Sequence, residues 1–227
     1  MSSAIIDLDN VRKIYEMGDT TVEALKGSNV EIQEGEFVAV MGPSGSGKST
    51  LMNMIGALDT PSSGEVHVGD EAISKLGEDE LALLRSKKIG FIFQQFNLIP
   101  SMNATENVAL PMLFRGVSKK ERTESAEEIL TRVGLGERLH HMPSELSGGQ
   151  RQRVSIARSL ANDPDIILAD EPTGNLDSET GENIMDLLTE LNEEGKTIIM
   201  VTHDENDAEY ADRIIKIVDG KTGVEEE

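Results

Sequence analysis

Apolar and polar positions alternate along the first third of the chain as they do in strands, and short polar turns interrupt the alternation. The predicted strands there cover residues 4–15, 22–32 and 37–41, with a further strand pair around residues 64–68. Later, four short apolar runs bounded by glycine, aspartate or proline are typical of buried parallel strands. These runs cover residues 89–93, 165–169, 197–202 and 213–218.

Between the first two of these parallel strands, the spacing of apolar residues becomes helical. One helix is predicted to begin at Ser118, which stands in capping-box spacing with Glu121, and to end at Gly134. A second helix is predicted over residues 150–162, because an Asp-Pro pair follows it. We expect this stretch to form a helical subdomain.

Composition narrows the class of protein. Only 37% of the residues are apolar, and the longest apolar runs fall far short of the roughly 20 residues that span a bilayer, so we expect a soluble chain. The N-terminus lacks the basic and apolar segments of a secretion signal. The chain has no cysteine, which excludes disulfides and thiolate metal sites and fits the cytoplasm.

The composition of the chain is strongly acidic. The 42 acidic and 21 basic residues give a net charge of −21, which argues against an extended surface for nucleic acid, so no nucleic-acid partner is expected. This acidity fits either a generally solvated surface or adaptation to a salty cytoplasm. The second interpretation is favoured because the excess is spread through the chain.

A glycine-rich loop follows the third predicted strand and precedes a helix expected over residues 50–58. Its glycines allow backbone N–H groups to turn toward the β- and γ-phosphates of a nucleotide, Lys48 adds a positive charge, and the Ser49 hydroxyl is suited to Mg²⁺. A plain turn between strand and helix is disfavoured, because all four fixed positions of the motif are present. The loop therefore predicts binding of a nucleoside triphosphate by Gly42, Pro43, Ser44, Gly45, Ser46, Gly47, Lys48, Ser49 and Thr50.

A second candidate site lies where an apolar strand ends in Asp170 and Glu171. Parallel sheets place their ligands at such ends. Asp170 is expected to hold Mg²⁺, and Glu171 to orient and deprotonate a water that attacks the γ-phosphate.

A third candidate site is the run Leu146-Ser147-Gly148-Gly149-Gln150. It precedes a predicted helix, so free N–H groups, a hydroxyl and the positive helix end would form an anion site, but without a lysine. One nucleotide does not readily need two such sites from one chain, which suggests that this one serves a nucleotide held by another copy. A glycine-rich helix cap remains an equal alternative.

In this order, the phosphate loop, residues 146–150, the Asp170-Glu171 pair, the turn at Asp177 and His203 resemble the ABC-type ATPases, over nearly the whole chain. The resemblance implies an α/β P-loop NTPase fold with a mostly parallel core sheet, an N-terminal antiparallel β-subdomain and an α-helical subdomain. It implies one domain over residues 1–227, with the core in 1–94 and 163–227 and the helical subdomain in 95–162.

The resemblance also assigns roles to residues that would otherwise look ordinary. Gln94 is similar to the glutamine of the family that touches Mg²⁺ or the attacking water, although alone it is a polar strand end. His203 would contact the γ-phosphate, Asp177 would cross a dimer interface, and Tyr15 would stack on adenine. Alone, Tyr15 would be a half-buried strand tyrosine.

Within this family the chain resembles the lipoprotein-release and macrolide-export branch. The similarity lies in residues 91–100, 107–111, 140–143 and 172–176. The segment 97–114 is more apolar than a small lobe is expected to expose, so it forms either a groove for a permease helix or the core of the subdomain.

The resemblance implies a transport-coupled ATPase that uses ATP and Mg²⁺. Two copies would form a head-to-tail homodimer on binding ATP and drive integral-membrane permease subunits from the cytoplasm, at the inner face of the cell membrane. Lys48, Gln94, Glu171 and His203 would be catalytic, with Ser49, Gln94 and Asp170 at the metal. Two alternatives are a soluble ABC-type ATPase switch acting on a non-transport complex and a P-loop kinase.

Overall fold

The computed structural model describes residues 4–18 and 20–224. The chain forms two compact units, which we call the phosphate-loop unit (Met1–Arg85 with Gly195–Glu227) and the helical unit (Ser86–Glu194). Among the described residues, no helix has the length and apolar character needed to cross a membrane.

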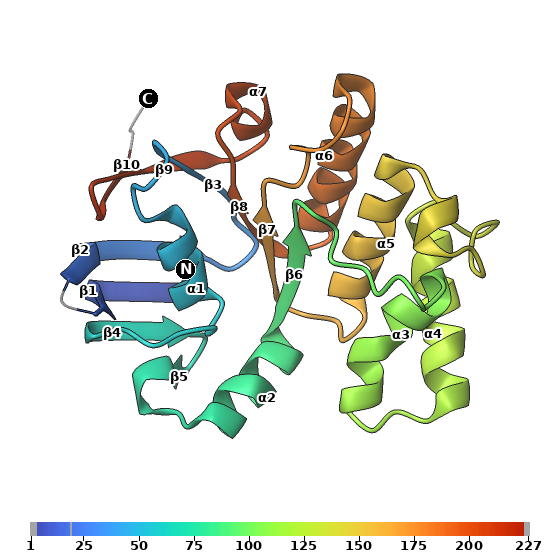
Figure 1. Ribbon diagram of the computed structural model, residues 1–227, viewed down its shortest axis with the longest axis horizontal. Coiled ribbons are helices and arrows are strands. Elements are labelled where there is room, and N and C mark those ends of the chain that lie inside the picture. The colour runs from blue at the N-terminus through green and yellow to red at the C-terminus, as the bar shows by residue number, and fades with distance from the viewer. Residues whose placement is uncertain (1–3, 19, 225–227) are drawn as a thin grey trace. The chain divides into compact units, whose positions relative to one another are not determined.

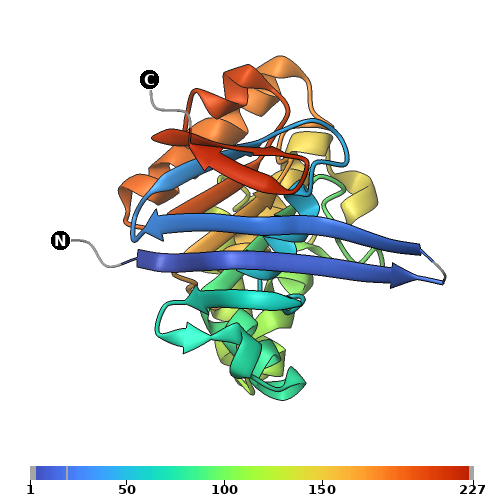
Figure 2. The same cartoon turned by 90° about the vertical axis from the view of Figure 1, so that its left-hand side faces the viewer.

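An antiparallel sheet forms one part of the phosphate-loop unit. Its strand order is β2 (Thr20–Gln33), β1 (Ala4–Met17), β4 (Ser63–Val68) and β5 (Glu71–Ala72). Figure 2 shows β1 and β2 as two long paired strands. Ile6, Leu8 and Leu25 are almost completely buried, because successive side chains of a strand alternate between its two faces. The antiparallel β-subdomain is thus present.

Parallel strands form the other part of this unit. The buried strand β3 (Phe37–Met41) lies between β8 (Thr197–Val201) and β9 (Arg213–Val218) and is parallel to both, while β10 (Lys221–Val224) pairs with β9 in the antiparallel sense. The helices of the unit are α1 (Lys48–Ile55), α2 (Glu78–Lys88, which reaches into the helical unit), α7 (Glu205–Ala208) and the short 3-10 helix η1 (Ile73–Lys75). The loop between β3 and α1 therefore begins at the carboxyl end of a central buried strand.

The helical unit contains the parallel pair β6 (Ile89–Phe93) and β7 (Ile166–Asp170). Its helices are α3 (Ala104–Phe114), α4 (Lys119–Arg132), η2 (Pro143–Glu145), α5 (Gly148–Leu160) and α6 (Ser178–Glu193). Helices α3, α4 and α5 pack against one another (Figure 1). Val108, Leu130 and Val154 are completely buried in this unit.

Most predicted elements are present with small changes at their ends. The capping box of Ser118 and Glu121 is formed in both directions, and α4 ends just before Gly134, as predicted. The expected helix over residues 50–58 was placed too late: α1 begins at Lys48 and ends at Ile55. The left-handed conformation of Ala57, at φ 49°, prevents the helix from continuing.

The α/β class is confirmed, with parallel strands, an antiparallel β-subdomain and a helical region. Helices α3 to α5 lie inside the predicted helical range of 95–162. The compact units divide instead at Arg85 and at Glu194. The domain boundaries at 94 and 163 stay a prediction.

Candidate nucleotide-binding site

The phosphate loop begins where β3 ends, and its first residue, Gly42, packs against Ile217 of β9. A β-carbon on Gly42 would overlap the carbonyl oxygen of Ile217, so only glycine fits there. Gly45 and Gly47 adopt left-handed conformations, with φ of 76° and 110°, which reverse the chain before α1. Ser46 is buried, and its hydroxyl has no partner among the described residues.

The N-terminus of α1 is left open. Its N-cap residue, Gly47, has no side chain to accept from the first N–H groups, and the first turn contains no acidic residue. Lys48 is folded back over the loop, where Nζ donates to the carbonyl oxygens of Gly42 (2.6 Å) and Pro43 (3.0 Å). Unpaired N–H groups, the positive helix end and this ammonium group fit a phosphate group.

His203 lies beside the same loop. It follows β8, whose Val201 pairs with Val40 of the neighbouring β3. Met41, Gly42, Pro43, His203, Lys216 and Val218 line a pocket of about 350 Å³. The phosphate-loop unit thus brings together two predicted groups, the loop and His203, and adds Lys216, which sequence analysis missed. Nothing in the local sequence around Lys216 indicated this position.

Tyr15 lies on β1 of the same unit. Its hydroxyl donates to Asp59 (3.2 Å), and the ammonium group of Lys13 lies 5.1 Å from the centroid of its ring. Lys13 also donates to Asp59 at 2.6 Å. Burial raises the pKa of Asp59, but the hydrogen bonds from Lys13, Thr60 and Tyr15, together with the charge of Lys13, outweigh it and hold that pKa below its usual value. Tyr15 is therefore fixed by its neighbours, and its expected contact with adenine stays a prediction.

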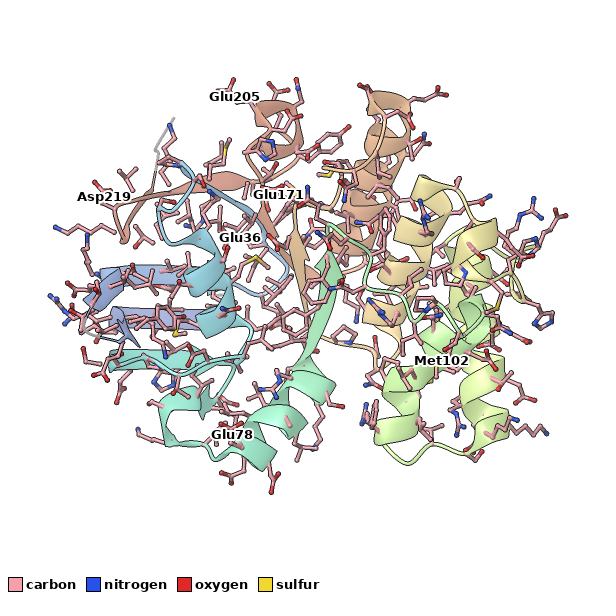
Figure 3. All side chains as sticks on the ribbon, in the orientation of Figure 1. Glu36, Glu78, Met102, Glu171, Glu205 and Asp219 are labelled. Atoms are coloured by element: carbon pink, nitrogen blue, oxygen red, sulfur yellow. The ribbon has the colours of Figure 1, made fainter. Side chains whose placement is uncertain are left out.

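The acidic strand end lies in the helical unit. The register of β6 and β7 pairs Phe93 with Asp170, so Gln94 and Glu171 each follow directly at the same edge. Glu171 lies where β7 ends (Figure 3) and has a left-handed backbone, with φ 45°. Such a conformation is rare for a residue with a side chain and often marks a functional turn.

Gln94 and Glu171 converge on one point. A β-carbon on Gly174 would lie 2.7 Å from Nε2 of Gln94 and 3.4 Å from Oε2 of Glu171, so both side chains reach this glycine. Asn175 donates to the carbonyl oxygen of Gln94 at 2.7 Å and holds the turn in place. The structure therefore brings an amide, a carboxylate and the neighbouring Asp170 to one edge. Their oxygen atoms are of the kind that Mg²⁺ prefers, and Ser49 of the phosphate-loop unit is the other predicted ligand.

Ser147 is the N-cap residue of α5. Its hydroxyl accepts from the N–H of Gln150 (3.3 Å), and the Gln150 side chain accepts from the N–H of Ser147 (3.0 Å). The hydroxyl and two of the N–H groups expected to meet an anion are therefore engaged in a capping box. The N–H groups of Gly148 and Gly149 are left to meet a ligand at this helix end.

The turn at Asp177 packs against these glycines. Asp177 caps α6 by accepting from the N–H (3.0 Å) and the hydroxyl (2.8 Å) of Thr180, and these bonds lower the pKa of Asp177. A β-carbon on Gly149 would overlap the methyl group of Thr180, and one on Gly148 would lie 3.3 Å from Leu176. Two predicted site segments that are distant in sequence thus form one surface.

Comparisons with known proteins found related sequences over nearly the whole chain. A family model described as "ABC transporter" matches residues 25–174. The chain is 56% identical to the uncharacterized ABC transporter ATP-binding protein MJ0796 of Methanocaldococcus jannaschii, over 98% of this chain and 97% of that protein. It is 53% identical to the macrolide export ATP-binding/permease protein MacB of Wolinella succinogenes, over 97% of this chain but 34% of that protein.

A solved structure has the same fold. The dimeric post-hydrolysis state of the ATP-binding cassette MJ0796, bound to ADP and Pi, superposes with a TM-score of 0.89 at 52% identity. The match covers 97% of this chain and 98% of that one. This similarity confirms the expected fold class.

We expect Gly149→Ala to destabilise the chain. The added methyl group collides with Thr180, whose rotation would break its bond to Asp177, and overpacking of this kind costs about 1–3 kcal/mol. Urea unfolding measures this loss. Thr180→Ser removes the colliding methyl group but keeps the hydroxyl, so the loss should largely disappear in that background; an equal loss in both backgrounds would contradict the packing.

We expect the carboxylate of Asp177 to make stability depend on pH. Because its folded-state pKa is lowered, its contribution is complete above the ordinary aspartate value of about 3.9 and is lost as pH falls through the folded-state value. Asp177→Asn keeps a capping oxygen without the charge. The stability difference between wild type and variant, from urea unfolding, should be largest near pH 7 and decrease toward pH 3. A difference independent of pH would contradict this.

Proposed function

The chain belongs to the ABC transporter family, and from this premise we propose that it is an ATP-hydrolysing motor subunit that drives a membrane permease. The observation that carries the proposal is the open N-terminus of α1, where a left-handed glycine stands in place of a capping side chain and Lys48 lies over the loop. This arrangement suits a triphosphate, and the carboxylate edge of β7 supplies groups suited to its hydrolysis.

In this proposal the phosphate-loop unit binds ATP. The loop N–H groups and Lys48 hold the β- and γ-phosphates, Tyr15 stacks on adenine, and His203 contacts the γ-phosphate. Lys48 must then leave the carbonyl oxygens of Gly42 and Pro43 for the phosphates. This exchange replaces neutral acceptors by charged ones, which strengthens the hydrogen bonds of the ammonium group.

The helical unit supplies the groups for hydrolysis. Glu171 orients the attacking water and accepts its proton, and Gln94, whose side chain also reaches Gly174, fixes the same water. Asp170, Gln94 and Ser49 would hold Mg²⁺, which neutralises phosphate charge when bound. Rate enhancement then depends on positioning and electrostatics more than on covalent chemistry.

We propose further that the site is completed by a second copy. The surface formed by Ser147 to Gln150 and Asp177 has a helix N-terminus but no lysine, which suits an anion already held elsewhere. A head-to-tail homodimer would place this surface of each copy on the ATP of the other. The dimeric form of the related cassette MJ0796 supports this assembly.

The permease would dock on the helical unit. From its sequence, segment 97–114 is expected to form either a groove for a permease helix or the core of the subdomain. Val108 and Met112 lie in the core, whereas Leu113 and Phe114 are 46% and 81% exposed. Beside them is a pocket of about 430 Å³ between α3 and α4, lined by apolar, acidic and basic side chains including Leu110, Glu127 and Arg122. An amphipathic helix of a permease fits such a surface.

The name of the relative MacB, a macrolide export ATP-binding/permease protein, supports a permease of the macrolide-export type. Since this chain spans about a third of that relative, the permease would be supplied by other polypeptides or segments. The chain would then act in the cytoplasm, at the inner face of the cell membrane.

We expect Glu171→Gln to bind ATP, to form a dimer when it does so, and to stay dimeric because the nucleotide is not hydrolysed. The amide cannot accept the proton of the attacking water, so phosphate release should fall by about 10²–10⁴-fold. Light scattering with ATP·Mg²⁺ should give twice the mass found without nucleotide. A variant that binds ATP but stays monomeric would contradict the dimer, and undiminished phosphate release would contradict the role of Glu171.

We expect Phe114→Ser to separate hydrolysis from docking. The side chain is exposed, so the soluble protein should keep its thermal stability and its phosphate release. Binding to inside-out vesicles that contain the permease of the proposed transporter should fall at least about tenfold, as for a docking anchor. Leu83→Ser, at an exposed leucine on α2, is the matched control. Equal binding by both variants would contradict this docking surface.

A further inference from the structure

Helix α5 carries an arginine that holds the chain just beyond Gln94. Arg158 donates from one terminal nitrogen to the carbonyl oxygen of Asn97 (2.6 Å) and from the other to that of Phe96 (2.8 Å). A guanidinium group has two such nitrogens in a fixed plane, which matches a pair of successive carbonyls. This fork therefore fixes the backbone two and three residues after Gln94.

The two residues that it holds are in an uncommon conformation. Phe96 and Asn97 are both left-handed, with φ of 59° and 48°, and neither is glycine. Such conformations persist where surrounding contacts impose them. Arg151 of the same helix adds a contact, with its guanidinium carbon 5.3 Å from the centroid of the Phe96 ring.

Among the residues that the structure describes, these two carbonyl oxygens are the hydrogen-bond partners of the Arg158 guanidinium group. Burial lowers the pKa of its guanidinium group, and among the described residues it forms no ion pair with a carboxylate. A side chain needed only for packing would avoid the cost of burying this charge. Its hydrogen bonds to the turn are the compensation that the structure provides.

Helix α5 also holds the turn after Glu171. Gln152 is completely buried and donates to the carbonyl oxygen of Pro172 at 2.6 Å. One helix thus fixes both turns whose side chains, Gln94 and Glu171, converge at Gly174. Displacement of either turn would separate those two groups.

We propose that Arg158 is a positioning residue for hydrolysis, which acts by holding the Phe96-Asn97 turn and thereby Gln94. The inference deepens the proposed function and rests on it. It assigns no contact between Arg158 and the nucleotide. The loss of Arg158 should therefore lower kcat only in chains where Gln94 is present to be positioned.

A double-mutant cycle tests this with steady-state phosphate release. Arg158→Ala should lower kcat by about 10-fold or more, as removal of outer-shell partners does, with KM for ATP changed less than twofold. Gln94→Ala should lower kcat at least as much. The double variant should match Gln94→Ala alone, because nothing is left for Arg158 to position.

Arg153→Ala is the matched control. Arg153 lies on the same helix and donates in the same way to a carbonyl oxygen, that of Val133 (2.9 Å), at the end of α4. Its loss should lower the melting temperature as Arg158→Ala does while leaving kcat within about twofold. Asn97→Gly in the Arg158→Ala background should restore part of kcat, since glycine adopts positive φ without strain.

Multiplicative losses of kcat in the double variant would overturn the proposal, and so would equal losses in Arg153→Ala and Arg158→Ala. If Arg158→Ala does not fold, Arg158→Lys replaces it in the double-mutant cycle, because lysine keeps the charge but cannot donate to both carbonyl oxygens in the same way. The same two results would overturn the proposal. A wild-type chain that releases no phosphate would instead contradict the proposed function.

Discussion

The open N-terminus of α1 determines what the phosphate loop is able to bind. Left-handed Gly45 and Gly47 turn the chain from β3 directly into the helix, so no side chain accepts from the first N–H groups. Only glycine fits at position 42, because Ile217 of β9 lies directly beside it. A chain folded this way has an unsatisfied cluster of donors beside a lysine, and an anion with several acceptor oxygens completes it.

The N-terminus of α5 contrasts with that of α1. Ser147 and Gln150 cap it reciprocally, and no lysine accompanies it, so it has weaker attraction for an anion of its own. Its two glycines pack closely against Leu176 and Thr180, which leaves little room for a larger residue at either position. Two helix ends with such different chemistry suit two different contacts with the same kind of nucleotide. In the proposed dimer, α1 binds the phosphates of its own ATP, and α5 contacts the ATP that is bound by the other copy. The rival interpretations, a soluble switch and a P-loop kinase, gain no support from the transporter relatives.

Sequence patterns predicted most of the strands and the helices α1, α4 and α5, because buried runs, caps and glycine stops are local signals. They also placed Gln94 and Glu171 at strand ends, and the register of β6 and β7 then explains why these residues meet. The contacts of Arg158 with Phe96 and of Gly149 with Thr180 join segments that are distant in sequence, so no local pattern indicated them. The same holds for Asp59, whose hydrogen bond with Tyr15 joins residues 44 positions apart in the chain.

In the proposed dimer, each nucleotide is held by the loop of one copy and closed by α5 of another. Complementation in the Glu171→Gln background tests it most directly, with Lys48→Ala in one copy and Ser147→Arg in the other. Neither variant alone should retain ATP on a desalting column. Their mixture should retain one ATP per mixed dimer, because the intact loop of one copy meets the intact Ser147 of the other. A mixture that retains none would contradict the account.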